Sequence, residues 1–213
     1  MRDYISLHAH SEFSNVKIID SINRYDRSID YCWDLGLGGV AMTEHDCVSG
    51  AIKYIKAFKK KLSKEWAKDH PDEELKTDED YNRVAEALDF KPILGNEIYL
   101  SEEGLTEQSN DEWTKEGHPG HFYHLILLAK DAEGFKQIRQ LSSAAWKRAW
   151  FRGILRTPTY PSDLEKFVSG GHIVCCTACL GGVPPYYVNK IYECGENDID
   201  GQYKWFYELE RWL

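Results

Sequence analysis

Five short apolar runs alternate with longer amphipathic segments along this chain, and the alternation restricts the folds that it can adopt. The apolar runs lie at about 4–8, 38–42, 92–99, 123–129 and 172–176. Helical patterns lie at about 21–36, 50–68, 78–88, 132–150, 162–168 and 199–212. Short apolar runs that alternate with helices are typical of an α/β fold with a parallel sheet. In such folds functional groups gather at the carboxyl ends of the strands.

Residue types that bind metals stand at or near the ends of these runs. His8 and His10 close the first run, His45 follows the second, Glu97 lies late in the third, and Cys179 follows the fifth. Side chains two residues apart on a strand point to the same face, so His8 and His10 can converge on one cation. Imidazole suits Zn, Fe, Mn and Cu. An isolated His-x-His is more often a polar pair at a strand end, but its recurrence with other ligand types favours a metal site.

Two further candidate ligands fit this pattern less well. His124 begins its apolar run instead of ending it, so we expect it on a hairpin or turn that reaches back over the mouth of the barrel. Asp20 precedes the helical pattern that starts at Ser21, and an aspartate there is equally well explained as a helix cap. Glu44, beside His45, is either a partner of the metal ligands or a surface residue.

Length, charge and cysteine content narrow the class of protein. The chain has 213 residues, 42% of them hydrophobic, which predicts a single domain over 1–213 with a substantial core. Its net charge of −9 argues against a phosphate-binding surface that acts unaided. No apolar run approaches the ~20 residues of a membrane span. Six cysteines without disulfide spacing, and no export signal at the start, predict thiols in a cytoplasmic protein.

Several segments outside the candidate site also carry predictions. The charged stretch 59–83 and the polar stretch 101–121 are expected to be surface insertions, the second of them a flap near the site. Arg156 belongs to a locally basic region and is a candidate phosphate contact. Cys176 and Cys179 have the spacing of half a structural zinc site, but the remaining cysteines show no second pair. Cys175 and Cys176 are expected to be buried on their strand.

Six short motifs occur in the order found in one known family. They are LHAHSEFS at 7–14, IDS at 19–21, AMTEHD at 41–46, KPILGNEIY at 91–99, YHLILLAK at 123–130 and TACLGG at 177–182. By these motifs the chain resembles the PHP (polymerase and histidinol phosphatase) family, and in particular the PHP domain of bacterial and phage DNA polymerase III alpha subunits. The resemblance extends over nearly the whole chain.

The resemblance implies a fold and a metal centre. The fold would be a distorted (β/α)7 barrel of the TIM-like kind, with up to three divalent ions (Zn, Mn or Fe) at its mouth. By motif position, one ion would have His8, His10 and Glu97 as ligands, and a second would have Glu97, His124 and Cys179. Asp20 and His45 would belong to a third. Glu97, His10 and His124 would be the catalytic residues.

One departure from the family pattern changes what we expect of this chain. Family members carry an Asp-x-His on a late strand that completes the first and third sites, and no Asp-x-His follows Cys179 here. We therefore expect the barrel to lack its last strands. The chain would then be either a naturally short relative or, as we favour, an amino-terminal fragment of a longer polymerase. Metal binding should then fall short of three ions.

Three functions remain open from the sequence. The first is a metal-dependent phosphoesterase, with 3′–5′ exonuclease activity as its specific form. The second is a metal-stabilised structural module without catalysis. The third, a stand-alone small-molecule phosphatase, is disfavoured because the motifs around Ile93 and His124 resemble those of polymerases. The expected partners are DNA, through the rest of a polymerase, and other polymerase domains or replisome subunits, with no membrane.

Overall fold

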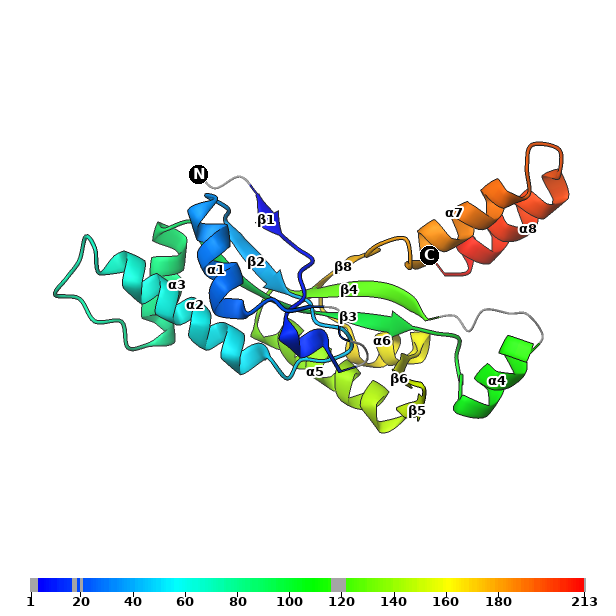
Figure 1. Ribbon diagram of the computed structural model, residues 1–213, viewed down its shortest axis with the longest axis horizontal. Helices are drawn as coiled ribbons and strands as arrows, with labels where there is room; N and C mark the ends of the chain where they lie inside the picture. The colour runs from blue at the N-terminus through cyan, green and yellow to red at the C-terminus, as the bar shows by residue number, and fades with distance from the viewer. Residues whose placement is uncertain (1–3, 17–18, 20, 116–121, 213) are drawn as a thin grey trace.

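A computed structural model describes residues 4–16, 19, 21–115 and 122–212. Its main feature is a curled sheet that resembles half a barrel (Figure 1). The strands of this sheet follow the order β1 (Ile5–Ser6), β2 (Gly39–Met42), β3 (Lys91–Leu100), β4 (Tyr123–Ala129) and β8 (Ile173–Cys176). A short strand, β7 (Pro158–Thr159), pairs with the end of β3. The α/β class and the partial barrel expected from the sequence are confirmed.

The strand directions differ from the parallel arrangement that the alternation predicts. β1, β2 and β3 are parallel to one another, but β4 runs antiparallel to both of its neighbours, β3 and β8. The start of β4 therefore lies beside the end of β3, with His124 opposite Tyr99. This reversal explains why His124, at the beginning of its apolar run, lies near the candidate ligands at the ends of other strands.

Each helical pattern in the sequence corresponds to a helix. These helices are α1 (Tyr25–Asp34), α2 (Ala51–Trp66), α3 (Asp78–Ala87), α5 (Ala132–Lys147), α6 (Pro161–Phe167) and α8 (Ile199–Glu210). α5 ends at Lys147, three residues before the predicted end, because a hairpin of β5 (Trp150–Arg152) and β6 (Ile154–Arg156) follows. α2 and α3 extend into the charged stretch 59–83, and Leu62 in that stretch is buried.

Besides the short strands β5, β6 and β7, three helical elements are not evident from the periodicity. A 3₁₀ helix, η1 (Glu12–Ser14), follows the His-x-His motif, and α4 (Glu107–Lys115) lies within the polar stretch 101–121. α7 (Val183–Glu193) contains two adjacent prolines, which signal a helix break. Both prolines fall in its first turn, where the backbone N–H groups need no partner within the helix. Figure 1 shows α7 and α8 as a helical hairpin that projects from the body of the molecule.

The two faces of the sheet bury different apolar groups. On the outer face, α1, α2 and α3 pack on β2 through a cluster that includes Met42, Tyr54 and Phe58. α5 packs farther along the same face, where Ile138 and Leu141 contact Leu127 and Ile98. The inner face carries the smaller cluster of Ala41, Ile126 and Leu128. Glu97 pairs in register with Ile126, so its carboxylate is presented on the inner face.

β8 is the last strand of the sheet path, and its side chains are less protected than predicted. Cys175 is exposed and Cys176 is half-buried, in contrast to the expectation that both are buried. The reason is that an edge strand has a neighbour on one side only, here β4. Within the described residues, no helix combines the length and the apolar character needed to cross a membrane.

Replacement of Phe58 tests the outer-face core. This side chain is 1% exposed and stacks on Phe90 with ring centroids 4.7 Å apart, so Phe58→Ala should lower the free energy of unfolding by about 3–5 kcal/mol. Ile52, on the same helix, is 65% exposed, and Ile52→Ala should change the free energy of unfolding by at most ~0.5 kcal/mol. Urea unfolding of both variants measures the difference. Equal losses would contradict this packing.

Candidate metal centre

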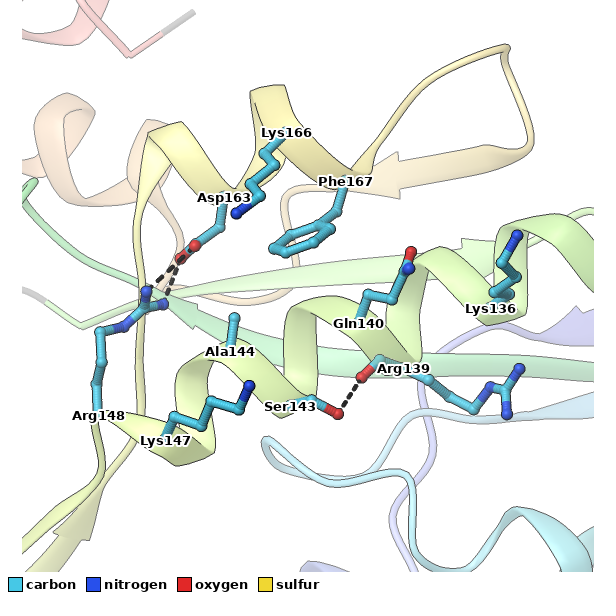
Figure 2. A pocket seen from close by; sticks show the side chains of 10 residues that line it. All are labelled: Lys136, Arg139, Gln140, Ser143, Ala144, Lys147, Arg148, Asp163, Lys166 and Phe167. Atoms are coloured by element: carbon cyan, nitrogen blue, oxygen red, sulfur yellow. Dashed lines mark hydrogen bonds and ion pairs between the residues drawn. The ribbon is translucent and has the colours of Figure 1, made fainter.

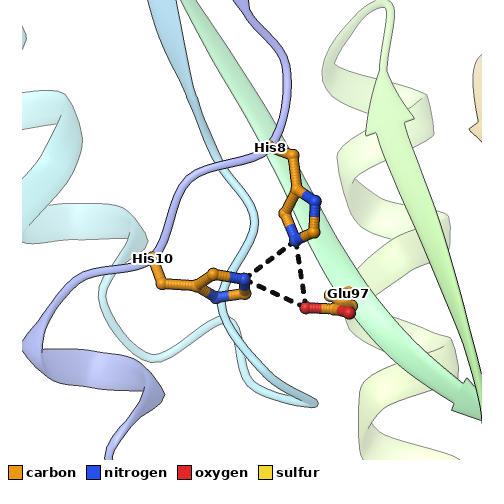
Figure 3. Close-up of side chains that lie close together, drawn as sticks. All are labelled: His8, His10 and Glu97. Carbon is orange, nitrogen blue, oxygen red and sulfur yellow. Dashed lines mark hydrogen bonds and ion pairs between the residues drawn. The ribbon is translucent and has the colours of Figure 1, made fainter. Parts of the chain in front are cut away.

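Glu97 is the point at which the ligand-type side chains meet. It lies in β3, its side chain is 1% exposed, and no lysine or arginine forms an ion pair with it among the described residues. His8 and His10 lie in the loop after β1 and converge on it (Figure 3). Their Nε2 atoms are 3.2 and 3.1 Å from Glu97 Oε2 and 2.8 Å from each other. Separations of about 3 Å are those of ligand atoms that share one ion with bonds of ~2.1 Å.

His45 approaches the same carboxylate oxygen from the end of β2. Its backbone forms an isolated parallel bridge with Glu97, and its Nδ1 lies 2.9 Å from Glu97 Oε2. The Tyr99 hydroxyl is 3.2 Å from the same ring nitrogen. Tyr99 follows Glu97 by two residues and therefore lies on the same face of β3. Three imidazoles thus surround one oxygen atom of Glu97.

The second oxygen of Glu97 faces a different group of residues. His124 Nδ1 is 2.7 Å from Glu97 Oε1, and Cys179 Sγ is 3.3 Å from His124 Nδ1. The antiparallel direction of β4 brings His124 to this end of the sheet, and Cys179 lies in the turn that follows β8. The Gly181 N–H donates to Cys179 Sγ, and the His124 N–H donates to Gly181 O. These backbone contacts hold the turn against the start of β4.

The charge and geometry of Glu97 suit a cation. Burial opposes ionisation of this carboxyl, but the surrounding imidazoles outweigh that effect and hold its pKa far below the ordinary value. Despite its closeness to His124, Oε1 is a buried oxygen without a geometrically sound hydrogen bond from any described residue. A buried carboxylate oxygen in that situation is unfavourable unless a cation or a donor supplies the missing interaction.

A chain of hydrogen bonds determines which nitrogen of His10 is free. Ser14 Oγ donates its single proton to Glu44, so toward other groups it can only accept. It accepts the His45 backbone N–H, and it lies 2.9 Å from His10 Nδ1. His10 Nδ1 must therefore carry a proton, so in the neutral tautomer the Nε2 lone pair is directed at Glu97. That lone pair and the carboxylate would then face each other, and a divalent ion between them removes the repulsion.

Glu44 supports this arrangement from beneath. Its side chain is completely buried and also accepts hydrogen bonds from Ser11 and the Tyr25 hydroxyl. The sequence left two roles open for Glu44. The structure shows that it is a buried partner of the residues that contact the ligands, and not a surface residue. The roles of Ser11 and Ser14 were not predicted. Ser11 caps the 3₁₀ helix η1 and Ser14 ends it, and two serines at this spacing directly after His10 are the signal that could have indicated them.

Asp46 is a third residue whose role sequence reasoning missed. It is buried, adopts a positive φ of 50°, and donates its backbone N–H to Glu97 O. Its carboxylate accepts from the Tyr99 N–H and the Thr157 hydroxyl, and its carbonyl accepts from the Trp146 indole. Asp46 therefore ties the His45 loop to β3 and to the carboxyl end of α5.

Arg156 lies near the centre without touching the carboxylate. Its guanidinium is 4.6 Å from the Phe122 ring centroid. Burial lowers its pKa, while the charges of Tyr99 and Asp46 act in the opposite direction. The predicted ligand Asp20 lies outside the described residues.

Apart from His45, which contacts Glu97 but belongs to neither group, the remaining ligand candidates form two groups around Glu97, and both have suitable donors. The first contains His8, His10 and Glu97, and the second contains Glu97, His124 and Cys179. In each group the donor atoms lie within 4.8 Å of one another. Imidazole, thiolate and carboxylate donors fit Zn, Fe or Mn, and a shared carboxylate is a common bridge between two such ions.

Comparison with known proteins identifies a family and several relatives. The PHP domain profile matches residues 6–211. The probable DNA polymerase YorL of Bacillus subtilis (strain 168) is 32% identical over 211 residues, which cover 94% of this chain and 14% of that protein. DNA polymerase III subunit alpha of Aquifex aeolicus (strain VF5) is 29% identical over 202 residues, with 92% and 14% covered.

A third relative, DNA polymerase III subunit alpha of Borreliella burgdorferi, is 27% identical over 197 residues, again 92% of this chain and 14% of the relative. The chain thus spans about a seventh of the length of these curated relatives. The profile match extends over nearly the whole sequence and includes each ligand-type residue that meets at Glu97. The chain belongs to the PHP domain family.

Proposed function

We propose that this chain is a metal-dependent phosphoesterase module of a DNA polymerase III alpha-type protein. The observation that carries the proposal is that the two oxygen atoms of one buried carboxylate, Glu97, face two separate sets of ligand-type side chains. The specific reaction that we propose is hydrolysis of phosphodiester bonds at DNA ends, as in a 3′–5′ exonuclease. The relatives named as DNA polymerases support DNA as the substrate class.

The proposed metal ligands are His8, His10, Glu97, His124 and Cys179, with Asp20 and His45 for a third ion. When bound, two divalent ions supply activation of water and stabilisation of the leaving oxygen in phosphate-ester hydrolysis. Glu97 bridges the two groups and provides their shared negative charge. His10 presents an unprotonated Nε2 because Ser14 holds the proton on Nδ1.

Residues around the ligands would position the substrate. Arg156 is a half-buried cation near Tyr99, and we propose that it binds a phosphate oxygen of the substrate. Its packing on Phe122 limits the motion of the guanidinium. The proposed partners are DNA and other polymerase domains or replisome subunits. The DNA contact would be made through the rest of a polymerase, as in the longer relatives.

A second function has an observation in its favour. The contacts of Glu97 join the loops after β1 and β2 to β3 and β4, so bound ions would also stabilise the fold. In that case the domain would brace a polymerase without turning over a substrate. The two functions differ in one respect, which is whether the metal-loaded protein cleaves phosphodiesters.

Substitution of Glu97 tests the bridge. Glu97→Gln keeps the size of the side chain and removes its charge, so metal content should fall sharply and phosphodiesterase activity on single-stranded DNA ends should decrease by ~100-fold or more. Glu86→Gln, an exposed change on α3, is the matched control and should alter neither. Elemental analysis and an end-labelled DNA assay measure the two effects.

Two results would count against parts of this proposal. Undiminished metal content in Glu97→Gln would exclude the bridging role of the carboxylate. Wild-type protein that is fully loaded with metal, yet cleaves neither DNA ends nor bis(p-nitrophenyl) phosphate, would exclude the phosphoesterase and leave the structural module.

Removal of the Ser14 hydroxyl tests the orientation of His10. Ser14→Ala frees His10 to carry its proton on Nε2, and metal affinity should fall by about 10–100-fold. Ser63→Ala, which removes a hydroxyl that contacts Tyr81 far from the centre, serves as the control. Metal titration with a competing chelator measures affinity, and circular dichroism monitors the fold. Equal affinities in the two variants would show that Ser14 does not orient His10.

A further inference from the structure

A groove between α5 and α6 concentrates positive charge on a chain that is acidic overall. The groove has a volume of about 650 Å³ (Figure 2). Five of its ten lining residues are Lys or Arg, compared with 26 of the 213 residues in the whole chain. The basic residues are Lys136, Arg139, Lys147, Arg148 and Lys166. The net charge of −9 is therefore a poor guide to this part of the surface.

Only part of this positive charge is neutralised within the protein. Arg148 pairs with Asp163, the one acidic residue of the lining, and Lys136 pairs with Glu133 on its own helix. Arg139, Lys147 and Lys166 form no ion pair with an acidic side chain in the part of the chain that the structure describes, and all three are exposed. Three cations that face one groove repel one another, and an anionic ligand would relieve that repulsion.

The dimensions of the groove favour an extended ligand with several charges. Lys136 and Lys147 are eleven residues apart on α5, which corresponds to ~16 Å along the helix axis. A single phosphate cannot contact both ends, whereas several consecutive phosphates of one strand can. Phe167 extends from α6 toward α5 beside the cations (Figure 2) and is half-buried against the apolar cluster of Ile138 and Leu141, so that only part of its ring is open to a ligand. An aromatic ring beside a row of cations is the combination that binds single-stranded nucleic acid.

The groove lies on the outer-face side of the sheet, and one of its ends is directed toward the strand ends that carry the ligands. α5 begins after β4, at the strand ends that are remote from the ligands, and runs back toward the ligands. Near its carboxyl end, the Trp146 indole donates to the carbonyl of Asp46, next to His45. α6 runs in the other direction, from β7 toward the start of β8. Lys147 and Arg148 therefore lie at the end of the groove that is near the metal centre, and Lys136 and Lys166 lie at the other end.

We infer that the α5–α6 groove binds the phosphate backbone of single-stranded nucleic acid. This inference deepens the proposed function, on which it rests, by assigning the domain a second contact surface for its polynucleotide substrate. Contacts from Arg139, Lys147 and Lys166 to phosphates supply affinity without sequence preference. Phe167 contributes stacking with a base.

The test measures binding separately from hydrolysis. Fluorescence anisotropy of a labelled oligo-dT strand is followed with the full chain in EDTA, so that the metal centre takes no part. Neutralisation of three contacts in R139Q/K147Q/K166Q should weaken binding by at least tenfold at low salt. It should also reduce the slope of log K against log salt by about 2, because each contact on a single strand contributes ~0.7.

A charge-matched control isolates the groove from general electrostatics. Lys56, Lys60 and Lys64 form an exposed stripe on α2, and K56Q/K60Q/K64Q removes the same three charges. It should retain the wild-type salt slope. Phe167→Leu should weaken binding of oligo-dT but leave binding of poly-glutamate unchanged.

Three outcomes would overturn the inference. These are no binding of oligo-dT by the wild type in EDTA, equal losses in the two triple variants, and binding of poly-glutamate as tight as that of oligo-dT with no effect of Phe167→Leu. The last outcome would assign the groove to an acidic protein instead. Failure of the phosphoesterase proposal would appear in the metal and cleavage assays and would leave this binding intact.

Discussion

The buried charge of Glu97 is the constraint on which the rest of the site depends. An isolated carboxylate is strongly unfavourable in a sheet interior, and here it is retained because four imidazoles surround it. Those imidazoles come from two strand ends and the start of a third strand. The cluster therefore holds the loops after β1 and β2 against β3 and β4, in addition to providing metal ligands.

Supporting residues turn this cluster into an ordered site. Through Ser14, Glu44 keeps a proton on the Nδ1 atom of His10. Asp46 joins the His45 loop to β3 and α5. Because these contacts are buried, the ligand side chains are held before any ion arrives. Such preorganisation is what a metal centre requires for both affinity and catalysis. The same Asp46 contact connects the centre to the helix that carries the basic groove.

Much of this architecture could be predicted from the sequence, since short apolar runs and helix patterns depend on local periodicity. The meeting of His8, His10 and Glu97 also followed from the positions of strand ends. The reversed direction of β4 could not be predicted, because strand direction depends on tertiary pairing that periodicity does not encode. For the same reason His124 was expected on a turn, although it lies within β4. The roles of Ser14 and Asp46 depend on contacts between segments about thirty to a hundred residues apart.

Anomalous diffraction from crystals of the metal-loaded protein would test the central claim most directly. We expect two peaks on either side of the Glu97 carboxylate, ~3.5–4 Å apart. One peak should lie about 2–2.5 Å from donor atoms of His8 and His10, and the other at that distance from His124 and Cys179. A single peak remote from Glu97, or the absence of any peak among these residues in metal-saturated crystals, would contradict the account.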